Sequence, residues 1–394
     1  MSHVITKLTY SFDNPRIIFG LNSITRLSEI IDELKCKKYL LVTDPNIEKT
    51  NIINEVKNYL KNIEGETYLI EPHEPYISDA EKIADFVRTR DYDVIIGVGG
   101  GSVLDLAKVA AFIVNNPGKV ADYIGAFKVK NKGLPLILVP TTAGTGSEVS
   151  AAIVLSTSEG IKVAIWSPKV MADFAIVDPQ LTLTMPPKIT ASSGLDALSH
   201  AFEALMSKRS NPLTDTIALE SIKLIFKYLP LAFFQGDNIE ARYYMALAAT
   251  MAGLAFSNAS LVAGHAIAYT YASEYKLPHG ISCGLALPYI MDFNLPTCID
   301  KFIRAAKIMD LPIGNLSDYE ISIKVIKNVK KIIKTVKAPV TLSDIGVSKN
   351  EIPKLAKSLI TDYARLLVYN PRRLEYEDAL DIFNRMWEGK IGEE

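Results

Sequence analysis

The sequence predicts an α/β domain built on a parallel sheet, followed by an all-helical domain. Over residues 1–185, short apolar runs alternate with amphipathic runs, which is the pattern of a parallel sheet covered by helices on both faces. The alternation stops at the adjacent Pro186 and Pro187, and helical patterns dominate beyond them. A chain of 394 residues is also too long for a single hydrophobic core. We therefore predict two domains, residues 1–185 and residues 186–394.

The individual elements follow from the same patterns. The apolar runs expected to form strands are residues 38–43, 66–70, 93–97, 136–139, 161–165 and 174–177. Helical patterns lie between them at residues 51–63, 78–90 and 102–115, and a last helix is expected at residues 379–388. No formal charge occurs between Arg242 and Glu274, but the stretch is dominated by small and polar residues. We interpret it as one or two buried helices rather than a membrane span.

Composition excludes several classes of partner. The net charge of −1 and the pI near 6.6 argue against nucleic acid or an anionic membrane. Cys36, Cys283 and Cys298 show no C-x-x-C spacing, so we expect free thiols in a reducing compartment. The first residues lack the apolar run of a signal peptide. The expected location is the cytoplasm.

Two polar loops at predicted strand ends indicate a nucleotide site. Gly99–Gly100–Gly101–Ser102 follows a strand and opens a helix, where glycines and free N–H groups can cradle a diphosphate. This is neither the G-x-G-x-x-G fingerprint nor a Walker loop, so a purely structural turn stays open. The second loop carries Thr141, Thr142 and Thr145, which suit a sugar, a phosphate or a nicotinamide amide. Its alternative is an ordinary surface loop.

Asp44 ends the predicted strand 38–43 and bears on the choice of cofactor. A carboxylate there can accept hydrogen bonds from the ribose hydroxyls of adenosine, and it would repel a 2′-phosphate. This favours NAD over NADP. The alternative is that Asp44 caps a helix whose first residue is Pro45.

Scarce histidines indicate a metal site. Asp196 and His200 are four residues apart in a predicted helix, so both side chains lie on one face and can bind one divalent ion. Such a pair alone is more often a surface or capping pair. The chain has five histidines, however, and His265 and His279 lie near each other in a second apolar region. We predict a site of three histidines and one aspartate.

These segments together resemble the iron-containing (group III) alcohol dehydrogenases over nearly the whole chain. The motifs that carry the resemblance are Val42–Asp44, Gly99–Ser102 with Asp105 and Lys108, Pro140–Glu148, Asp178–Pro179, Met185–Pro186, Gly194–Glu203, His265, Pro278–Gly280, Leu287–Pro288 and Asn370–Arg372. The resemblance implies a Rossmann-like dinucleotide-binding domain and a helical metal domain in a dehydroquinate synthase-like architecture, with the active site between them. A homodimer is implied as well.

The resemblance also assigns residues. It implies that Asp196, His200, His265 and His279 bind the metal, with Fe(II) first and Zn(II) second. The cofactor contacts that it implies are Asp44, Gly99, Gly100, Gly101, Ser102, Asp105, Thr141, Thr142, Thr145, Lys162, Thr182 and Leu183.

Two departures from the family pattern concern the nicotinamide end of the site. Many members carry a second histidine four residues after the position of His265, where it can pass a proton; here that position is Tyr269. We expect Tyr269 to relay the proton, and the alternative is a polar-tipped pocket wall. Glu74 occupies the place of an asparagine that would contact the cofactor.

The predicted activity is hydride transfer between a small alcohol and NAD, or the reverse reduction of an aldehyde or ketone. The metal is expected to act as a Lewis acid and the cofactor to carry the hydride. Three alternatives stay open: a hydroxyacid–oxoacid transhydrogenase with retained NAD, a dehydroquinate-synthase-like lyase, and a structural metal without catalysis.

Overall fold

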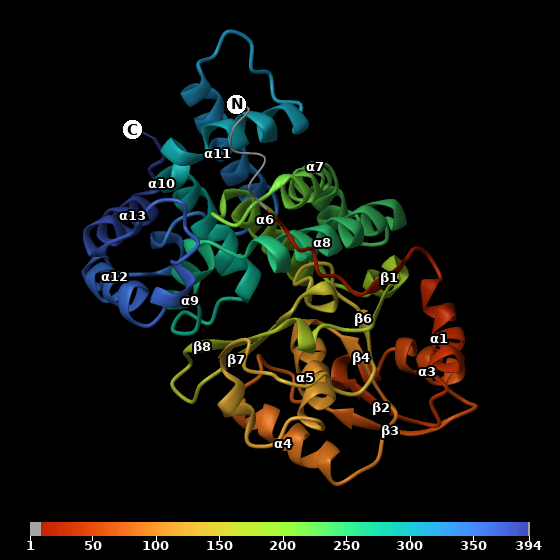
Figure 1. The fold of residues 1–394 in the computed structure, drawn as a ribbon. Coiled ribbons are helices and arrows are strands. Elements are labelled where there is room, and N and C mark those ends of the chain that lie inside the picture. Colours follow the sequence, from red (N-terminus) through yellow and green to blue (C-terminus); the bar gives the residue numbers. More distant parts are fainter. Residues whose placement is uncertain (1–8, 393–394) are drawn as a thin grey trace.

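The computed structural model describes residues 9–392, in which an α/β half is followed in the chain by a helical half (Figure 1). Six parallel strands form the main sheet, in the order β1-β9-β6-β4-β2-β3. Their bounds are β1 (Arg16–Phe19), β2 (Lys38–Thr43), β3 (Glu64–Leu69), β4 (Val94–Gly99), β6 (Leu136–Pro140) and β9 (Phe174–Val177). The central strands β4 and β6 are buried along their whole length, because helices cover both faces.

Two hydrophobic layers enclose this sheet. Helices α4 (Ile77–Arg88) and α5 (Gly101–Ile113) pack on one face, and α1 (Leu27–Leu34) and α3 (Asn51–Tyr59) pack on the other. The short α2 (Pro45–Glu48) follows β2. The predicted parallel sheet and its covering helices are thus confirmed.

One predicted strand belongs to a second, three-stranded sheet. The run expected at residues 161–165 forms β8 (Lys162–Trp166), which lies in a separate sheet of order β5-β8-β7 and pairs antiparallel with β7 (Ala152–Ser156). The third strand of this sheet is β5 (Gly125–Ala126). Apolar patterns locate strands but do not select their partners, since pairing depends on long-range contacts.

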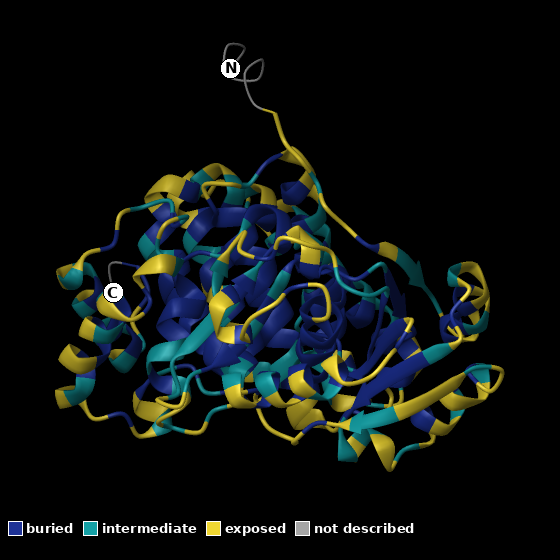
Figure 2. Ribbon diagram, turned by 60° about the horizontal axis from the view of Figure 1, so that its bottom comes forward, coloured by how far each residue is buried: buried dark blue, intermediate teal, exposed yellow. Residues whose placement is uncertain are grey.

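Within the described residues, every regular element of the second half is a helix. Its helices are α6 (Pro187–Met206), α7 (Pro212–Phe234), α8 (Ile239–Ala259), α9 (Ala263–Ala272), α10 (His279–Ile308), α11 (Asp318–Thr335), α12 (Ile352–Thr361) and α13 (Tyr376–Glu388). Figure 2 shows their buried residues gathered in the interior, with exposed residues on the outer helices. Within residues 9–392, no single helix is both long enough and apolar enough to span a membrane. Helices α8 and α9 reach that length and apolar character only when they are taken together, and they are bent by 108° where they meet.

The two halves meet where the loop after β6 packs on α6 and α8. A Cβ at Gly144 would lie 2.7 Å from the Ser193 Cα, and one at Gly146 would lie 2.4 Å from the Gly253 Cα. Gly146 also has φ of +60°, so glycine is required there for both reasons. The predicted boundary at residues 185/186 falls between β9 and α6, and the division into two domains stays a prediction.

Candidate active site

Strand ends gather the residues predicted to bind the dinucleotide. Because β2, β4 and β6 are parallel neighbours, the loops that follow them emerge at one edge of the sheet. Gly101 opens α5 directly after β4, and a side chain there would lie 2.7 Å from the Thr145 Cγ2. The glycine turn and the threonine loop are therefore in contact. The first N–H groups of α5 and the positive end of its dipole favour an anion at this place, as the predicted diphosphate contact requires.

Several predicted contacts lie at this edge. Gly100 and Ser102 are half-buried at the start of α5. The Thr141 hydroxyl is buried and, within residues 9–392, has no hydrogen-bond partner. A buried hydroxyl without a partner is uncommon, which favours a ligand contact there.

Asp44 performs the capping role as well. Its Oδ1 accepts hydrogen bonds from the backbone N–H groups of Asn46 (2.7 Å) and Ile47 (3.2 Å), and Pro45 is the first residue of α2. Both bonds use the same oxygen. Oδ2 accepts no hydrogen bond from the described residues, so the capping role is compatible with the predicted ribose contact.

Other predicted cofactor residues have protein partners. The carboxylate of Asp105 accepts from the Ser147 hydroxyl (2.6 Å) and the Val154 N–H (2.9 Å), so its position favours a structural role. The buried Thr182 hydroxyl donates to the Pro179 carbonyl at 2.7 Å. Leu183 follows it and is exposed.

The four predicted metal ligands come together on three helices. Asp196 and His200 lie on α6, His265 lies on α9, and His279 is the first residue of α10. The Asp196 Oδ1 atom lies 3.7 Å from His200 Nε2, 3.6 Å from His265 Nε2 and 3.4 Å from His279 Nε2. The His200 ring stacks on Phe256 and on His265, with centroids 4.3 and 4.8 Å away.

These spacings fit one divalent ion. Ligand atoms ~2.0–2.1 Å from a tetrahedral metal lie ~3.3–3.4 Å apart, close to the separations around Asp196. The possible ligand atoms of Asp196, His265 and His279 also lie within 4.8 Å of one another, whereas His200 is outside this group and approaches it through its 3.7 Å contact with Asp196. The buried Asp196 Oδ1 and His265 Nε2 have no hydrogen-bond partner in the described chain, which is the state expected of ligand atoms. The donor set of imidazoles and a carboxylate suits iron, zinc or a similar transition metal.

The charge state of two ligands also suits a metal. Burial opposes ionisation of Asp196, but the neighbouring imidazoles outweigh it and lower the pKa of the carboxyl. Burial lowers the pKa of His200 to about 3, so this imidazole is neutral. An ionised aspartate and a neutral histidine are the forms that bind cations. For His279, burial opposes protonation, but Cys283 and Asp196 outweigh it and raise the pKa to about 9, so this imidazole would release a proton on binding metal.

Comparison with known proteins identifies the family. Two protein-family models match the chain. The family model described as "Iron-containing alcohol dehydrogenase" matches residues 14–179, and the one described as "Fe-containing alcohol dehydrogenase family, C-terminal" matches residues 190–387. The chain belongs to the iron-containing alcohol dehydrogenase family. The predicted activity class, an NAD-linked alcohol dehydrogenase, agrees with this membership, and neither the transhydrogenase nor the lyase is better supported.

Relatives and solved structures cover almost the whole chain. Long-chain-alcohol dehydrogenase 1 of Geobacillus thermodenitrificans (strain NG80-2) is 37% identical over 96% of this chain and 98% of its own. The 1,3-propanediol dehydrogenase of Klebsiella pneumoniae is 34% identical over 93% of this chain and 96% of its own. A crystal structure of 1,3-propanediol oxidoreductase superposes with a TM-score of 0.92 at 33% identity, over 96% of this chain and 100% of the other.

A more distant structure supports the fold alone. Maleylacetate reductase from Agrobacterium tumefaciens has a TM-score of 0.81 at 21% identity, over 98% of this chain and 99% of the other. The expected dehydroquinate synthase-like architecture is therefore confirmed.

Tyr269, where many members of the iron-containing alcohol dehydrogenase family have histidine, lies against the metal ligands. Its ring stacks on His279 at 5.6 Å between centroids and meets His265 edge-on at 6.2 Å. Burial raises the pKa of Tyr269, so its hydroxyl stays protonated at neutral pH and can donate a hydrogen bond.

Glu74 and Lys162 form an ion pair near the same ligands. Burial opposes ionisation of Glu74, but Lys162 and His279 outweigh it and lower the pKa of the carboxyl. The Lys162 carbonyl accepts a hydrogen bond from Arg365. Glu74 is thus a charged group held by lysine, where the family pattern has a neutral amide.

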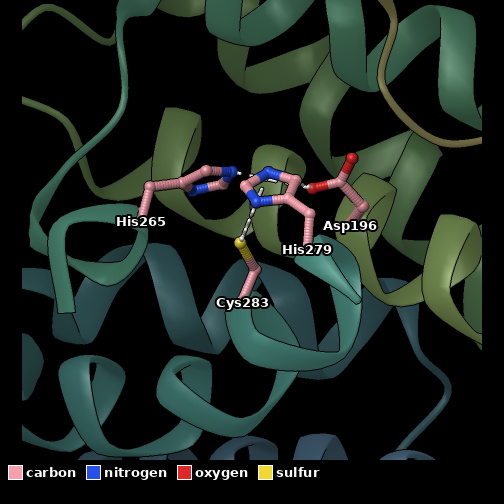
Figure 3. Close-up of side chains that lie close together, drawn as sticks. All are labelled: Asp196, His265, His279 and Cys283. Carbon is pink, nitrogen blue, oxygen red and sulfur yellow. Dashed lines mark hydrogen bonds and ion pairs between the residues drawn. The ribbon is translucent and has the colours of Figure 1, made fainter. Parts of the chain in front are cut away.

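Cys283 is a neighbour of the ligands that the histidine pattern did not include. Figure 3 shows Asp196, His265 and His279 turned toward one another, with the Cys283 sulfur beside the His279 ring. The sulfur lies 3.7 Å from His279 Nε2, and its possible ligand atom is within 4.8 Å of those of Asp196, His265 and His279. The signal in the sequence was its position four residues after His279 on one helix.

Proposed function

We propose that the chain interconverts small alcohols and the corresponding aldehydes or ketones, using NAD(H) and one divalent metal held by Asp196, His200, His265 and His279. The observation that carries the proposal is the convergence of three imidazoles on one buried aspartate oxygen, at 3.4–3.7 Å. The loop after β6, which holds the candidate cofactor threonines, packs directly on the helix of Asp196.

Bound metal would supply a Lewis acid for the alcohol or carbonyl oxygen, and NAD(H) would accept or deliver the hydride. The residues of the chain position these groups. The glycine turn and Thr141, Thr142 and Thr145 would hold the diphosphate and nicotinamide side of the cofactor. The Tyr269 hydroxyl would relay the proton that the alcohol loses: as its oxygen accepts that proton, its own O–H proton would pass to water, and the same transfer would run backwards in reduction.

We propose iron as the first choice of metal and zinc as the second. The family name and the imidazole–carboxylate donor set support iron, and the same donors suit zinc. For the dinucleotide we propose NAD over NADP, because the unused Oδ2 of Asp44 suits ribose hydroxyls and would repel a 2′-phosphate. Lys162, Thr182 and Leu183 stay predicted cofactor contacts.

The substrate class rests on the relatives. Their names specify a long-chain alcohol, methanol (an NAD-dependent enzyme of Bacillus methanolicus) and 1,3-propanediol. We propose an alcohol or diol that presents one hydroxyl to the metal site. A homodimer in the cytoplasm is our expectation for the whole enzyme, which size-exclusion chromatography with light scattering and cell fractionation test.

A metal-replacement screen tests the function. Protein stripped by a chelator would be reloaded with Fe(II) or Zn(II) and assayed for NADH oxidation with small aldehydes, ketones and oxoacids. Activity should return when metal is added, and the proposed order of metals predicts more activity with Fe(II) than with Zn(II). His279→Ala should lose metal affinity by more than the roughly 10–100-fold that loss of an outer hydrogen-bond partner costs. Full turnover by metal-free His279→Ala protein would rule the proposal out.

A further inference from the structure

Glu203 is a fully buried carboxylate that bridges two of the metal-site helices. It lies on α6, and its side chain reaches the first turn of α9. The Oε1 atom lies 2.6 Å from His265 Nδ1, and Oε2 accepts hydrogen bonds from the backbone N–H groups of Val262 (3.1 Å) and His265 (3.4 Å). Glu203 therefore contacts the backbone and the imidazole of the same residue.

The position of Glu203 on α6 follows the helical repeat. Asp196, His200 and Glu203 are spaced by four and three residues, so they share one face of the helix. The first two point to the candidate metal position, and the third contacts the far side of His265.

The geometry assigns the tautomer of His265. Two backbone N–H groups donate to Oε2, and the 2.6 Å contact between Oε1 and His265 Nδ1 holds one proton; a carboxylate that accepts at both of its oxygens leaves that proton on Nδ1. The lone pair is then on Nε2. This atom faces Asp196 Oδ1 at 3.6 Å and is without a hydrogen-bond partner in the described residues.

We propose that Glu203 is a positioning residue of the metal centre, which fixes His265 in the Nδ1–H tautomer and holds Nε2 in place as a ligand. Ligand histidines generally donate their second N–H to a carboxylate or carbonyl, which fixes the ring and raises its basicity. This inference rests on the metal-dependent function proposed above.

The neighbouring glycine indicates that this approach is built into the fold. A Cβ at Gly264 would lie 2.5 Å from Glu203 Oε1 and 2.8 Å from its carboxyl carbon. Any larger residue would displace the carboxylate from His265. The contact between Glu203 and His265 therefore explains why the residue before His265 is glycine.

Charge compensation supports the same role. In the described part of the chain, His265 is the ion-pair partner of Glu203, whereas the buried Asp292 is paired with Arg385. Asp196 and Glu203 are both buried carboxyl groups on either side of His265, and a divalent ion held by Asp196 and His265 would balance their charge. Without a cation, burial of both carboxylates would be costly.

The test compares metal affinity in Glu203→Gln and wild type by chelator competition, with Zn(II) and Co(II) as probes. The amide introduced by Glu203→Gln has one oxygen and one NH₂ group. If its oxygen faces His265 Nδ1, its NH₂ group faces the N–H groups of Val262 and His265, and donors then oppose donors. The opposite orientation favours the wrong tautomer. We expect the affinity to fall roughly 10–100-fold. The control is Asp292→Asn, a buried carboxylate about 20 Å along α10 from His279, which should leave metal affinity unchanged.

The outcomes separate this inference from the proposed function. If wild type binds metal and folded Glu203→Gln binds it equally well, the role of Glu203 is overturned and the metal-dependent function stands. If wild type binds no divalent ion, both fail. Should Glu203→Gln not fold, proton NMR of Co(II)-loaded wild type decides. A slowly exchanging, paramagnetically shifted histidine N–H signal supports the tautomer, and absence of any such signal overturns it.

Discussion

Tyr269 is the residue whose substitution tests the proton step most directly. Its ring stacks on His279, and phenylalanine preserves that contact while removing the hydroxyl. We expect Tyr269→Phe to lower kcat by roughly 10²-fold, at the lower end of what a positioned acid–base group contributes, with KM little changed. Metal content, measured in parallel, should equal that of wild type. An unchanged kcat would show that water or another group carries the proton.

Residue chemistry explains which parts of the site the sequence could predict. The predicted metal ligands were found because histidine is scarce in this chain and because Asp196 and His200 are one helical turn apart. In the structure, the Nε2 atoms of His200, His265 and His279 lie 3.4–3.7 Å from the Asp196 Oδ1 atom. The role of Glu203 was outside the reach of a spacing argument, because its partner is 62 residues away in the chain and becomes a neighbour only when α6 packs beside α9. A buried glutamate has no signature of its own in a sequence.

At the scale of elements, the start of α2 combines stability with cofactor choice. Serine caps a helix about as well as aspartate but carries no charge. In Asp44→Ser, the free energy of unfolding should stay within about 0.5 kcal/mol of wild type. The ratio of kcat/KM for NADPH to that for NADH should rise roughly tenfold or more, since 1.4 kcal/mol of lost repulsion is a factor of ten. A ratio that does not move would remove Asp44 from cofactor selection.

Glu148 is a buried carboxyl group at the contact between α8 and the loop that follows β6, and its titration should affect stability. Glu148 lies in the turn Ser147–Val149 and accepts a hydrogen bond from the Thr250 hydroxyl at 3.1 Å. Burial raises the pKa of Glu148, and its hydrogen bonds offset this only in part. The folded chain therefore holds a proton that the unfolded chain releases above pH ~4.3.

The sign of the pH effect follows from proton linkage. Because the folded state binds the extra proton, stability from this group falls as pH rises from the unfolded toward the folded pKa of Glu148. Glutamine mimics the protonated form. Urea unfolding over a series of pH values above ~4.3 should show a shallower decline for Glu148→Gln than for wild type. Parallel declines in the two proteins would contradict the assignment.

Elements were predicted where a strong local pattern exists. The strands β2, β4, β6 and β9 match the apolar runs to within a few residues, and α5 begins at the predicted glycine turn. The strand β1 was missed, because its four residues are bounded by irregular chain and only partly buried. For β8 the strand was predicted, but the separate sheet that it forms with β7 was not, since the two strands pair through contacts that the local pattern does not show.

At the scale of the whole molecule, a bound metal should stabilise the packing of α6, α9 and α10. A ligand that binds only the folded state at a hundred times its Kd adds roughly 2.7 kcal/mol to the free energy of unfolding. Thermal unfolding with and without a chelator should show this difference in wild type. In His279→Ala the difference should be much smaller. Equal transitions for wild type under both conditions would mean that no ion links these helices.

The large apolar cluster of the helical half has one more consequence, which concerns the order of events in the cell. It contains buried residues from α6 through α13, and none of the four predicted metal ligands is among them. Asp196 and His279 are far apart in sequence and become neighbours only where α6 and α10 pack together, so we expect this packing to precede metal binding. Newly made enzyme should accumulate as a finished apoprotein that awaits its ion, and the supply of metal, rather than the rate of synthesis, would then set how much of it is active.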